Sequence, residues 1–352
     1  MDPRLDEGNA SQDPLAARYA SLAGARLPTR LRGAVPEDLK RAVSALNAGS
    51  SARLAARWGH VLRVAQFELH EALRSKLFVF VLVLFGAGAG IASHLFLSAL
   101  AAAETRAREA VAAATGVGVE RVPEDLVRVE LGRFLSQFVE NQELAQQLVR
   151  IQPLAVFHGF VSLNLVALLV LIVSSGAIAG DLQSGAVRFI LPRCDRRAWT
   201  LGKALGQALL LATGLGVGAL VAGLVGQAEA SHFGASGWLW LGIMSLRTWF
   251  YGMAYLGLFL GLSQLVRSAL GARALALLFL IGCALGHSIL SAPFVQEHLP
   301  FAAWLGWLFP ANYKAALWSP SLPEQVGAAV ALLAIGAVGF ALGQAVFQRK
   351  DA

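Results

Sequence analysis

The stretch Ile178–Lys203, IAGDLQSGAVRFILPRCDRRAWTLGK, separates two apolar runs that are each long enough to cross a membrane as a helix. Its first half has apolar residues at helical spacing. These positions are Leu182, Ala186, Phe189 and Ile190. Pro192 ends the helix, because the residue before a proline is disfavoured in the α conformation. The second half is basic. We therefore predict a short amphipathic helix over 182–191, within a loop over 181–203, that docks a soluble partner.

The composition indicates a membrane protein. Of the 352 residues, 56% are hydrophobic and only 14% are charged, which is too apolar for an ordinary soluble domain. Six stretches have the length and apolar character of transmembrane helices. The predicted spans lie near 77–100, 157–180, 204–226, 248–266, 274–292 and 326–347. The fold class that we predict is an all-α integral membrane protein with six transmembrane helices.

The distribution of basic residues predicts the topology. The formal net charge is +7, and Lys and Arg concentrate in segments that one topology places on the same side of the membrane. By the positive-inside rule both termini are then cytoplasmic, and the charge indicates no nucleic-acid partner. The excess of arginine over lysine and the abundance of alanine suggest a bacterial protein, which places it in the bacterial cytoplasmic (inner) membrane.

Two regions precede the first predicted span. Residues 1–52 are polar and are interpreted as a cytoplasmic N-terminal extension, whereas 53–350 form the transmembrane domain. The domain begins with an N-terminal amphipathic interfacial helix that lies on the inner leaflet of the lipid bilayer. Its apolar stripe consists of Leu54, Trp58, Val61, Leu62, Ala65, Leu69 and Leu73.

Two outer segments are also expected to be helical. Residues 101–156 form a helical outer loop between the first and second spans, which either packs on its own spans or binds an extracytoplasmic partner. Before the sixth span, prolines interrupt an aromatic-rich segment that is too broken to cross the bilayer. We predict re-entrant outer helices there, anchored by Trp304, Trp307 and Phe309.

The chain has no sequence motif for binding ATP. Gly202-Lys203 is not a phosphate-binding loop, because Arg197 occupies the position of the first glycine and Ala204 replaces the serine or threonine. The histidines have no metal-ligand spacing. We therefore expect no catalytic, cofactor or metal site on this chain, and any ATP-Mg site belongs to another subunit.

One short motif leaves an alternative open. The sequence Gly-Ala-Ser-Gly at 234–237, followed by His287, is similar to the Ser–His pair of rhomboid-type intramembrane serine proteases. In that interpretation Ser236 is the nucleophile and His287 activates it. A non-transporting membrane anchor or assembly protein is a further alternative.

The opening stretch resembles the permease subunits of ABC-2 type ABC transporters. Many of them have a pattern I-x-G-E-x-x-x-G-T between the second and third spans, then a short proline-ended helix and a basic start to the third span. Ile178, Gly180, Asp181 and Gly185 match it. The chain departs from it at Asp181, where glutamate is commoner, and at Gln183 and Ala186. Together with the six-span layout, the resemblance covers about residues 55–350.

This resemblance implies a function. The chain would be the permease subunit of an exporter, forming the pathway as a homodimer or heterodimer with a second permease subunit. Separate ATP-binding subunits would hydrolyse ATP and dock on the 182–191 coupling helix. The re-entrant segment with Trp304, Trp307 and Phe309 would close the outer gate. The implied docking residues are Asp181, Leu182, Gly185, Ala186, Phe189 and Ile190.

Overall fold

The computed structural model describes residues 58–116, 118, 151–192, 194–230, 233–298, 302–319 and 321–349. The chain divides into two units, Met1–Gly59 and His60–Ala352, and the second contains the long helices. The predicted extension 1–52 and the part of the outer loop over 119–150 lie outside the described residues. Within the described ranges the regular structure is entirely helical, which confirms the all-α class.

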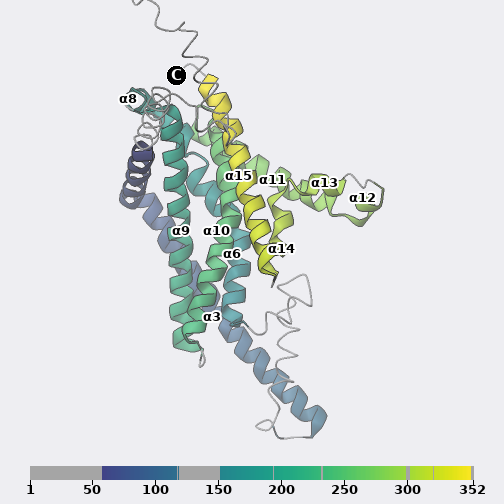
Figure 1. The fold of residues 1–352 in the computed structure, drawn as a ribbon. Coiled ribbons are helices and arrows are strands. Elements are labelled where there is room, and N and C mark those ends of the chain that lie inside the picture. Colours follow the sequence, from purple (N-terminus) through teal and green to yellow (C-terminus); the bar gives the residue numbers. More distant parts are fainter. Residues whose placement is uncertain are drawn as a thin grey trace, which may run out of the picture. The chain divides into compact units, whose positions relative to one another are not determined.

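The second unit is a bundle of long helices (Figure 1). Helix α10 packs on α15, α6, α9 and α11, and α3 lies against α9 and α6. The main core lies where α6, α9, α10 and α15 meet, with Trp199, Tyr251 and Phe259 fully buried. The long helices are α3 (Lys76–Thr115), α6 (Pro153–Ser174), α9 (Arg196–Glu229), α10 (Ala235–Ser263), α11 (Ala269–Leu290) and α15 (Leu322–Arg349).

Five of the described helical segments have the length and composition of a membrane span. They are Lys76–Ala113, Pro153–Ser184, Arg196–Glu229, Ala269–Leu290 and Leu322–Arg349. Helix α10 is not among them, although its 29 residues exceed the length that a bilayer core requires. Arg247, Tyr251 and Tyr255 lower its hydropathy. Because α10 packs on four other long helices, it has less need of an apolar surface than a lipid-facing helix does.

The long helices extend past the predicted spans. Helix α3 continues to Thr115 and ends where Gly116 adopts φ 68°, a left-handed conformation that favours glycine. Helix α10 begins at Ala235, thirteen residues before the predicted start at 248 (248 − 235 = 13). Hydropathy detects only the part of a helix that suits lipid, so the charged end of α3 is missed. In α10 a charged residue, Arg247, interrupts an otherwise apolar run just before the predicted start.

Glycines bring α10 and α15 into close contact. A Cβ atom on Gly257 or Gly261 of α10 would overlap the backbone of Gly336 or Gly339 of α15. Gly343 faces the Gly261 backbone in the same way. Small residues let two helix backbones approach closely, and this packing is common between helices in membranes. The α10–α15 contact therefore depends on glycine in both helices.

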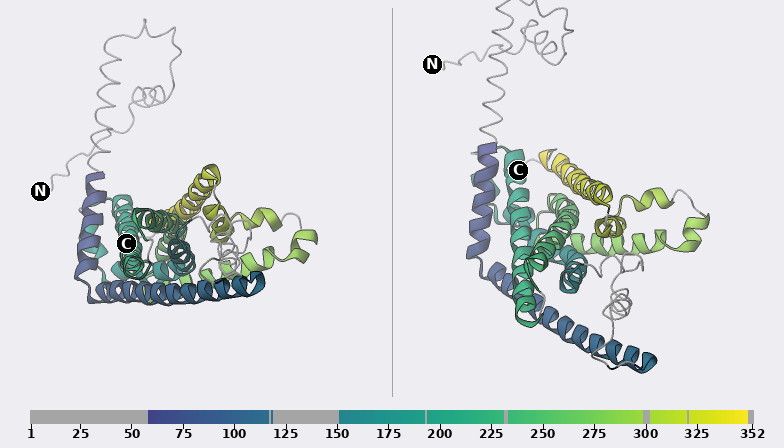
Figure 2. Two further views of the ribbon diagram at one scale, coloured as in Figure 1. Left: turned by 90° about the horizontal axis from the view of Figure 1, so that it is seen from below. Right: turned by 60° about the horizontal axis from the view of Figure 1, so that its bottom comes forward.

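The segment before α15 consists of short helices, as its prolines predict. They are α12 (Pro293–His298), α13 (Ala302–Gly306), the 3₁₀ helix η3 (Pro310–Tyr313) and α14 (Lys314–Trp318). Figures 1 and 2 show α12 and α13 projecting to one side of the bundle. Trp304 and Trp307 in this arm are largely exposed, at 82% and 66%. Phe309 packs against Gly286 of α11. The re-entrant placement stays a prediction.

Candidate functional site

The segment between α6 and α9 forms two short helices. Helix α7 (Ala177–Ser184) follows α6 after a turn at Ser175–Gly176, and α8 (Val187–Ile190) precedes Pro192. Gly185 lies between α7 and α8 with φ 74°, a left-handed conformation that ends α7. The prediction of one helix over 182–191 is therefore wrong. Gly185 interrupts the single continuous helix that the apolar spacing predicts.

Helix α7 is firmly attached to the bundle. Ile178 and Ala179 are fully buried, and the Ala179 amide donates a hydrogen bond to Ser263 Oγ at the end of α10 (3.0 Å). The Gln183 side-chain oxygen accepts a hydrogen bond from the Ala269 amide at the start of α11 (2.9 Å). A displacement of α7 would therefore act directly on α10 and α11.

The predicted docking residues divide between core and surface. Phe189 is 81% exposed. Leu182 and Ile190 are partly buried and pack against the main core, and Val187 is buried beside them. Of the two residues predicted to form an apolar tip, Phe189 is largely exposed and Ile190 packs partly against the core, and their role in docking stays a prediction. The remaining predicted positions, Asp181, Gly185 and Ala186, are partly exposed.

A buried ionic network holds Asp181. Lys203 of α9 forms ion pairs with Asp181 of α7 (Nζ–Oδ2 2.7 Å) and with Glu68 of the helix over 58–74. The Lys203 side chain is only 5% exposed and that of Glu68 9%. Gln207 donates to Glu68 Oε2 (3.3 Å) and accepts from Ser174 Oγ of α6 (2.9 Å). The network thus joins four elements: the N-terminal helix, α6, α7 and α9.

The charges in this network do not balance, since one lysine faces two carboxylates. Burial raises the pKa of the Glu68 carboxyl above its ordinary value of 4.5, although Lys203 lowers it, and the charge on Asp181 raises it further. Removing one member of a buried ion pair typically costs about 3–5 kcal/mol, because the remaining charge is left uncompensated. Lys203 is the member on which both carboxylates depend.

The N-terminal helix packs on α9 through two glycines. A Cβ atom on Gly202 would lie 2.5 Å from Val64 Cβ, and one on Gly206 would lie 2.7 Å from Glu68 Cβ. Sequence reasoning did not identify Glu68 or Lys203 as part of the site. A signal was present, because Glu68 follows Val61 and Ala65 at i+7 and i+3, on the face that the structure buries.

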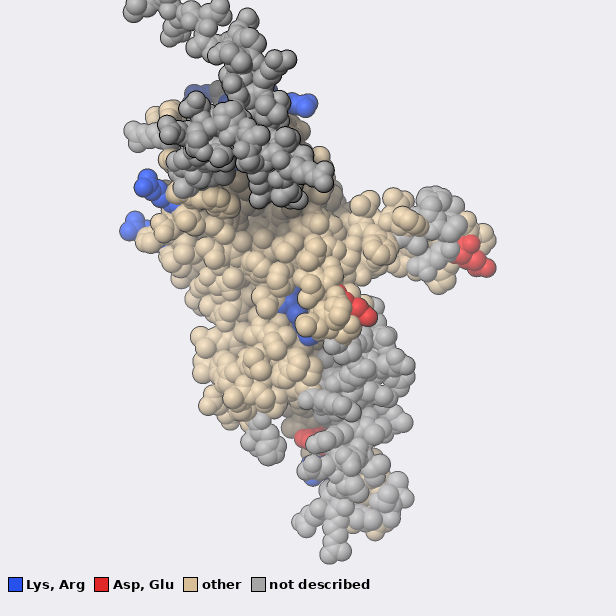
Figure 3. Space-filling model, in the orientation of Figure 1, with Lys and Arg blue, Asp and Glu red and all other residues tan. Residues whose placement is uncertain are grey.

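A basic groove lies beside α8. Its volume is about 730 Å³. Arg196 donates to the Phe347 carbonyl (3.5 Å) and Arg197 to the Gln348 side-chain oxygen (3.1 Å), so the start of α9 is attached to the end of α15. The lining residues are Arg188, Leu191, Pro192, Cys194, Asp195, Arg196, Arg197 and Gln348. On the face shown in Figure 3, Lys and Arg gather toward the α8 end of the bundle.

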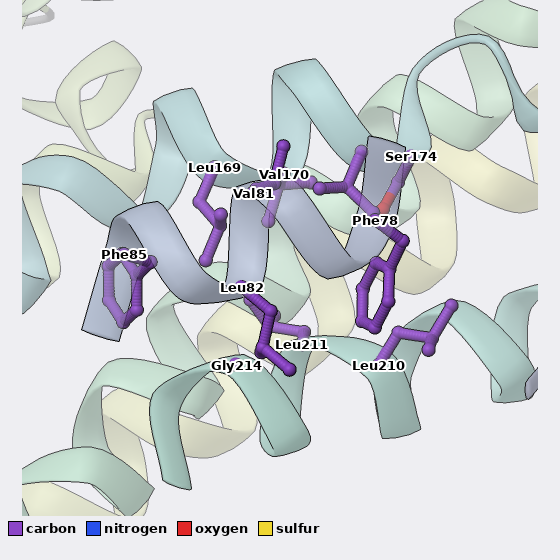
Figure 4. Close-up of a pocket in the computed structure, with 11 residues that line it drawn as sticks. Phe78, Val81, Leu82, Phe85, Leu169, Val170, Ser174, Leu210, Leu211 and Gly214 are labelled. Carbon is purple, nitrogen blue, oxygen red and sulfur yellow. The ribbon is translucent and has the colours of Figure 1, made fainter. Parts of the chain in front are cut away.

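A second cavity lies between α3, α6 and α9 (Figure 4). Phe78 and Phe85 of α3 line it together with aliphatic side chains such as Leu169 and Leu211, and Ser174 is its polar member. Its volume of about 20 Å³ holds little more than one water molecule. The cavity is therefore a packing gap beside the ionic network and is too small for a transported substrate.

Polar contacts also connect the helices of the bundle. Lys314 of α14 donates to Asn164 Oδ1 of α6 (3.0 Å) and lies 5.4 Å from the ring centroid of Tyr251 in α10. His158 of α6 hydrogen bonds to Ser245 of α10 (3.2 Å). Since Asn164 is the twelfth of the 22 residues in α6 (164 − 153 + 1 = 12), α14 reaches the middle of that helix. Helix α14, the last part of the segment before α15, therefore packs on the bundle.

The protease motif is not assembled in the described part of the chain. Ser236 is an exposed residue in the first turn of α10, and His287 lies in the last turn of α11. No hydrogen bond between these two side chains occurs among the described residues. The described residues also contain no cluster of three or more His, Cys, Asp or Glu side chains that could hold a metal ion.

The bundle of membrane-length helices defines a multi-pass membrane protein. The family model described as ABC-2 family transporter protein matches residues 62–352, and the chain belongs to this family. No curated protein matches the sequence. The chain is thus a membrane component of an ATP-binding cassette (ABC) transporter, and the family implies an ATP-binding subunit as its partner.

Proposed function

We propose that the chain is the permease subunit of an ABC exporter, which forms the membrane pathway as a dimer and docks separate ATP-binding subunits through α7 and α8. The proposal rests above all on Phe189, whose side chain is 81% exposed at the end of a segment that is otherwise attached to the bundle. A large apolar side chain on a rigid base is typical of a residue that dominates a protein–protein contact.

Movement of the ATP-binding subunit would reach the spans through α7. A force on Phe189 acts on α8 and, across Gly185, on α7. From α7 the contacts continue to α9 through Asp181 and Lys203 (2.7 Å) and to α10 through Ser263 (3.0 Å). Glu68 would move with Lys203, so the N-terminal helix would follow α9. ATP hydrolysis occurs on the partner in this account, with no ATP-Mg site on this chain.

The same proposal includes the topology. We place α10 as a further membrane span, the fourth of six along the chain, with both termini on the cytoplasmic side of the bacterial inner membrane. Support comes from the length of α10 and from the basic residues beside α8. The arm with Trp304 and Trp307 then lies at the outer interface, and Phe309 holds it against α11 as part of an outer gate.

Co-purification with the ATP-binding subunit tests the docking proposal. A buried phenylalanine contributes roughly 1.5–3 kcal/mol, and a buried unpaired carboxylate costs more, so Phe189→Asp should abolish recovery of the partner. Phe294→Asp is the matched control, because Phe294 is 69% exposed on the α12 arm. Equal recovery of the ATP-binding subunit with both variants would contradict docking through Phe189.

A further inference from the structure

The groove beside α8 is basic, and two of its arginines are attached to a neighbouring helix. Among the described residues that line it are three arginines and one aspartate, which together carry a net charge of +2 (3 − 1 = 2). Arg196 and Arg197 are held in place by their hydrogen bonds to Phe347 and Gln348 at the end of α15. The groove therefore presents guanidinium groups from the α9 start in orientations that two helices determine.

The apolar and basic features of this surface are adjacent. Arg188 lines the groove and directly precedes Phe189 in α8. Leu191 and Pro192, which follow α8, supply apolar lining to the same groove. A partner that covers Phe189 would thus also meet the groove, and its complementary surface would need an apolar pocket next to negative charge.

We propose that this groove receives an acidic segment of the ATP-binding subunit, so that docking has an apolar part at Phe189 and an ionic part at Arg188, Arg196 and Arg197. The inference rests on the proposed function and adds the chemistry of the partner. Arginine pairs with carboxylates through two parallel hydrogen bonds, which fixes orientation as well as charge. Complementary charge at an interface also accelerates association.

A protein partner explains the groove better than an anionic lipid headgroup does. Asp195 contributes a carboxylate to the lining, which a negatively charged membrane surface would repel. A protein can match a mixed surface, with carboxylates opposite the arginines and a basic or amide group opposite Asp195. The volume of about 730 Å³ accommodates several side chains of one segment.

The test uses the complete chain in lipid nanodiscs with the ATP-binding subunit that co-purifies with it. The double variant Arg188→Glu/Arg197→Glu should bind that subunit about tenfold or more weakly, chiefly through slower association, and with less dependence on salt. Arg267→Glu, in the exposed connection between α10 and α11, makes the same kind of charge change away from the groove and should bind normally. Arg197→Lys should show an intermediate loss, since charge remains without the planar fork.

The outcomes separate this inference from the proposed function. If Phe189→Asp prevents docking while the double variant binds like the wild type at every salt concentration, the acidic-segment inference is overturned and the docking proposal stands. If neither variant weakens binding, both are overturned. Comparison of nanodiscs with phosphatidylglycerol and with phosphatidylcholine alone tests the lipid alternative. The double variant could bind the ATP-binding subunit like the wild type and lose only the enrichment of phosphatidylglycerol around the chain. That result would assign the groove to lipid and contradict the inference.

Discussion

The Nζ atom of Lys203 in α9 lies 2.7 Å from the Oδ2 atom of Asp181 in α7, and the same ammonium group also pairs with Glu68. This contact pairs the partly exposed Asp181 carboxylate with a buried lysine, whereas the Phe189 side chain is largely exposed. Asp181 thus positions α7 on α9, and in the proposed docking mode the contact with a partner falls to α8.

The first prediction concerns Lys203. Lys203→Met leaves Glu68 and Asp181 without their common cation, and we expect a loss of stability of about 3–5 kcal/mol. Glu68→Gln leaves one carboxylate paired with Lys203 and should cost much less. Thermal unfolding in detergent compares the two variants with the wild type. Equal melting temperatures for Lys203→Met and Glu68→Gln would show that the network does not hold these helices together.

The second prediction is a pH dependence. Because burial raises the pKa of Glu68, the folded protein holds that proton more tightly than the unfolded chain does. The resulting stabilisation is complete below the ordinary value of 4.5 and disappears as the pH rises through the folded pKa. The melting temperature of the wild type relative to Glu68→Gln should therefore rise as the pH is lowered toward that value. A difference that is constant with pH would contradict the assignment.

The third prediction concerns the contact between α10 and α15. Gly261→Ala places a Cβ atom on the Gly339 backbone, where no side chain can move aside, so we expect a loss of about 1–3 kcal/mol or failure to fold. Gly242→Ala, in the same helix, is the matched control, because a Cβ there meets nothing within 4 Å. Unfolding midpoints measure both. A well-tolerated Gly261→Ala would refute the close contact of these two helices.

The fourth prediction tests the topology. In a Cys283→Ser background, Ser236→Cys at the exposed start of α10 should react with an impermeant maleimide in intact cells, and native Cys194 should not. Burial and the neighbouring Asp195 raise the pKa of the Cys194 thiol, which slows its reaction even where the reagent has access. Permeabilised cells at raised pH are therefore the control. Labelling of Cys194, but not of position 236, in intact cells would reverse the orientation.

The sequence predicted the helices well because membrane-length apolar runs carry a strong signal. It predicted their ends poorly: α10 begins at Ala235, and the prediction missed this start because Arg247 interrupts an apolar run that continues on both sides of it. The break of the docking segment at Gly185 depends on a single left-handed residue. The apolar spacing alone did not indicate that break.

The ionic network was beyond sequence reasoning for a different reason. Glu68 and Lys203 are 135 positions apart, and their pairing depends on the close packing of the N-terminal helix on Gly202 and Gly206. Composition identifies charged residues but does not state which ones meet. The available indication was Glu68, an acidic residue on the buried face of the N-terminal helix. The interpretation of that helix as amphipathic considered only its apolar residues.

The most direct test of the account is to identify what touches position 189. A photoreactive amino acid placed at Phe189 is activated in intact cells, and the cross-linked species is identified by mass spectrometry, with position 294 as the exposed aromatic control on the α12 arm. We predict a cross-link from position 189 to an ATP-binding cassette subunit, and none to that subunit from position 294. Cross-linking of position 189 to lipid alone, in cells that express the ATP-binding subunit, would contradict the docking role of α8.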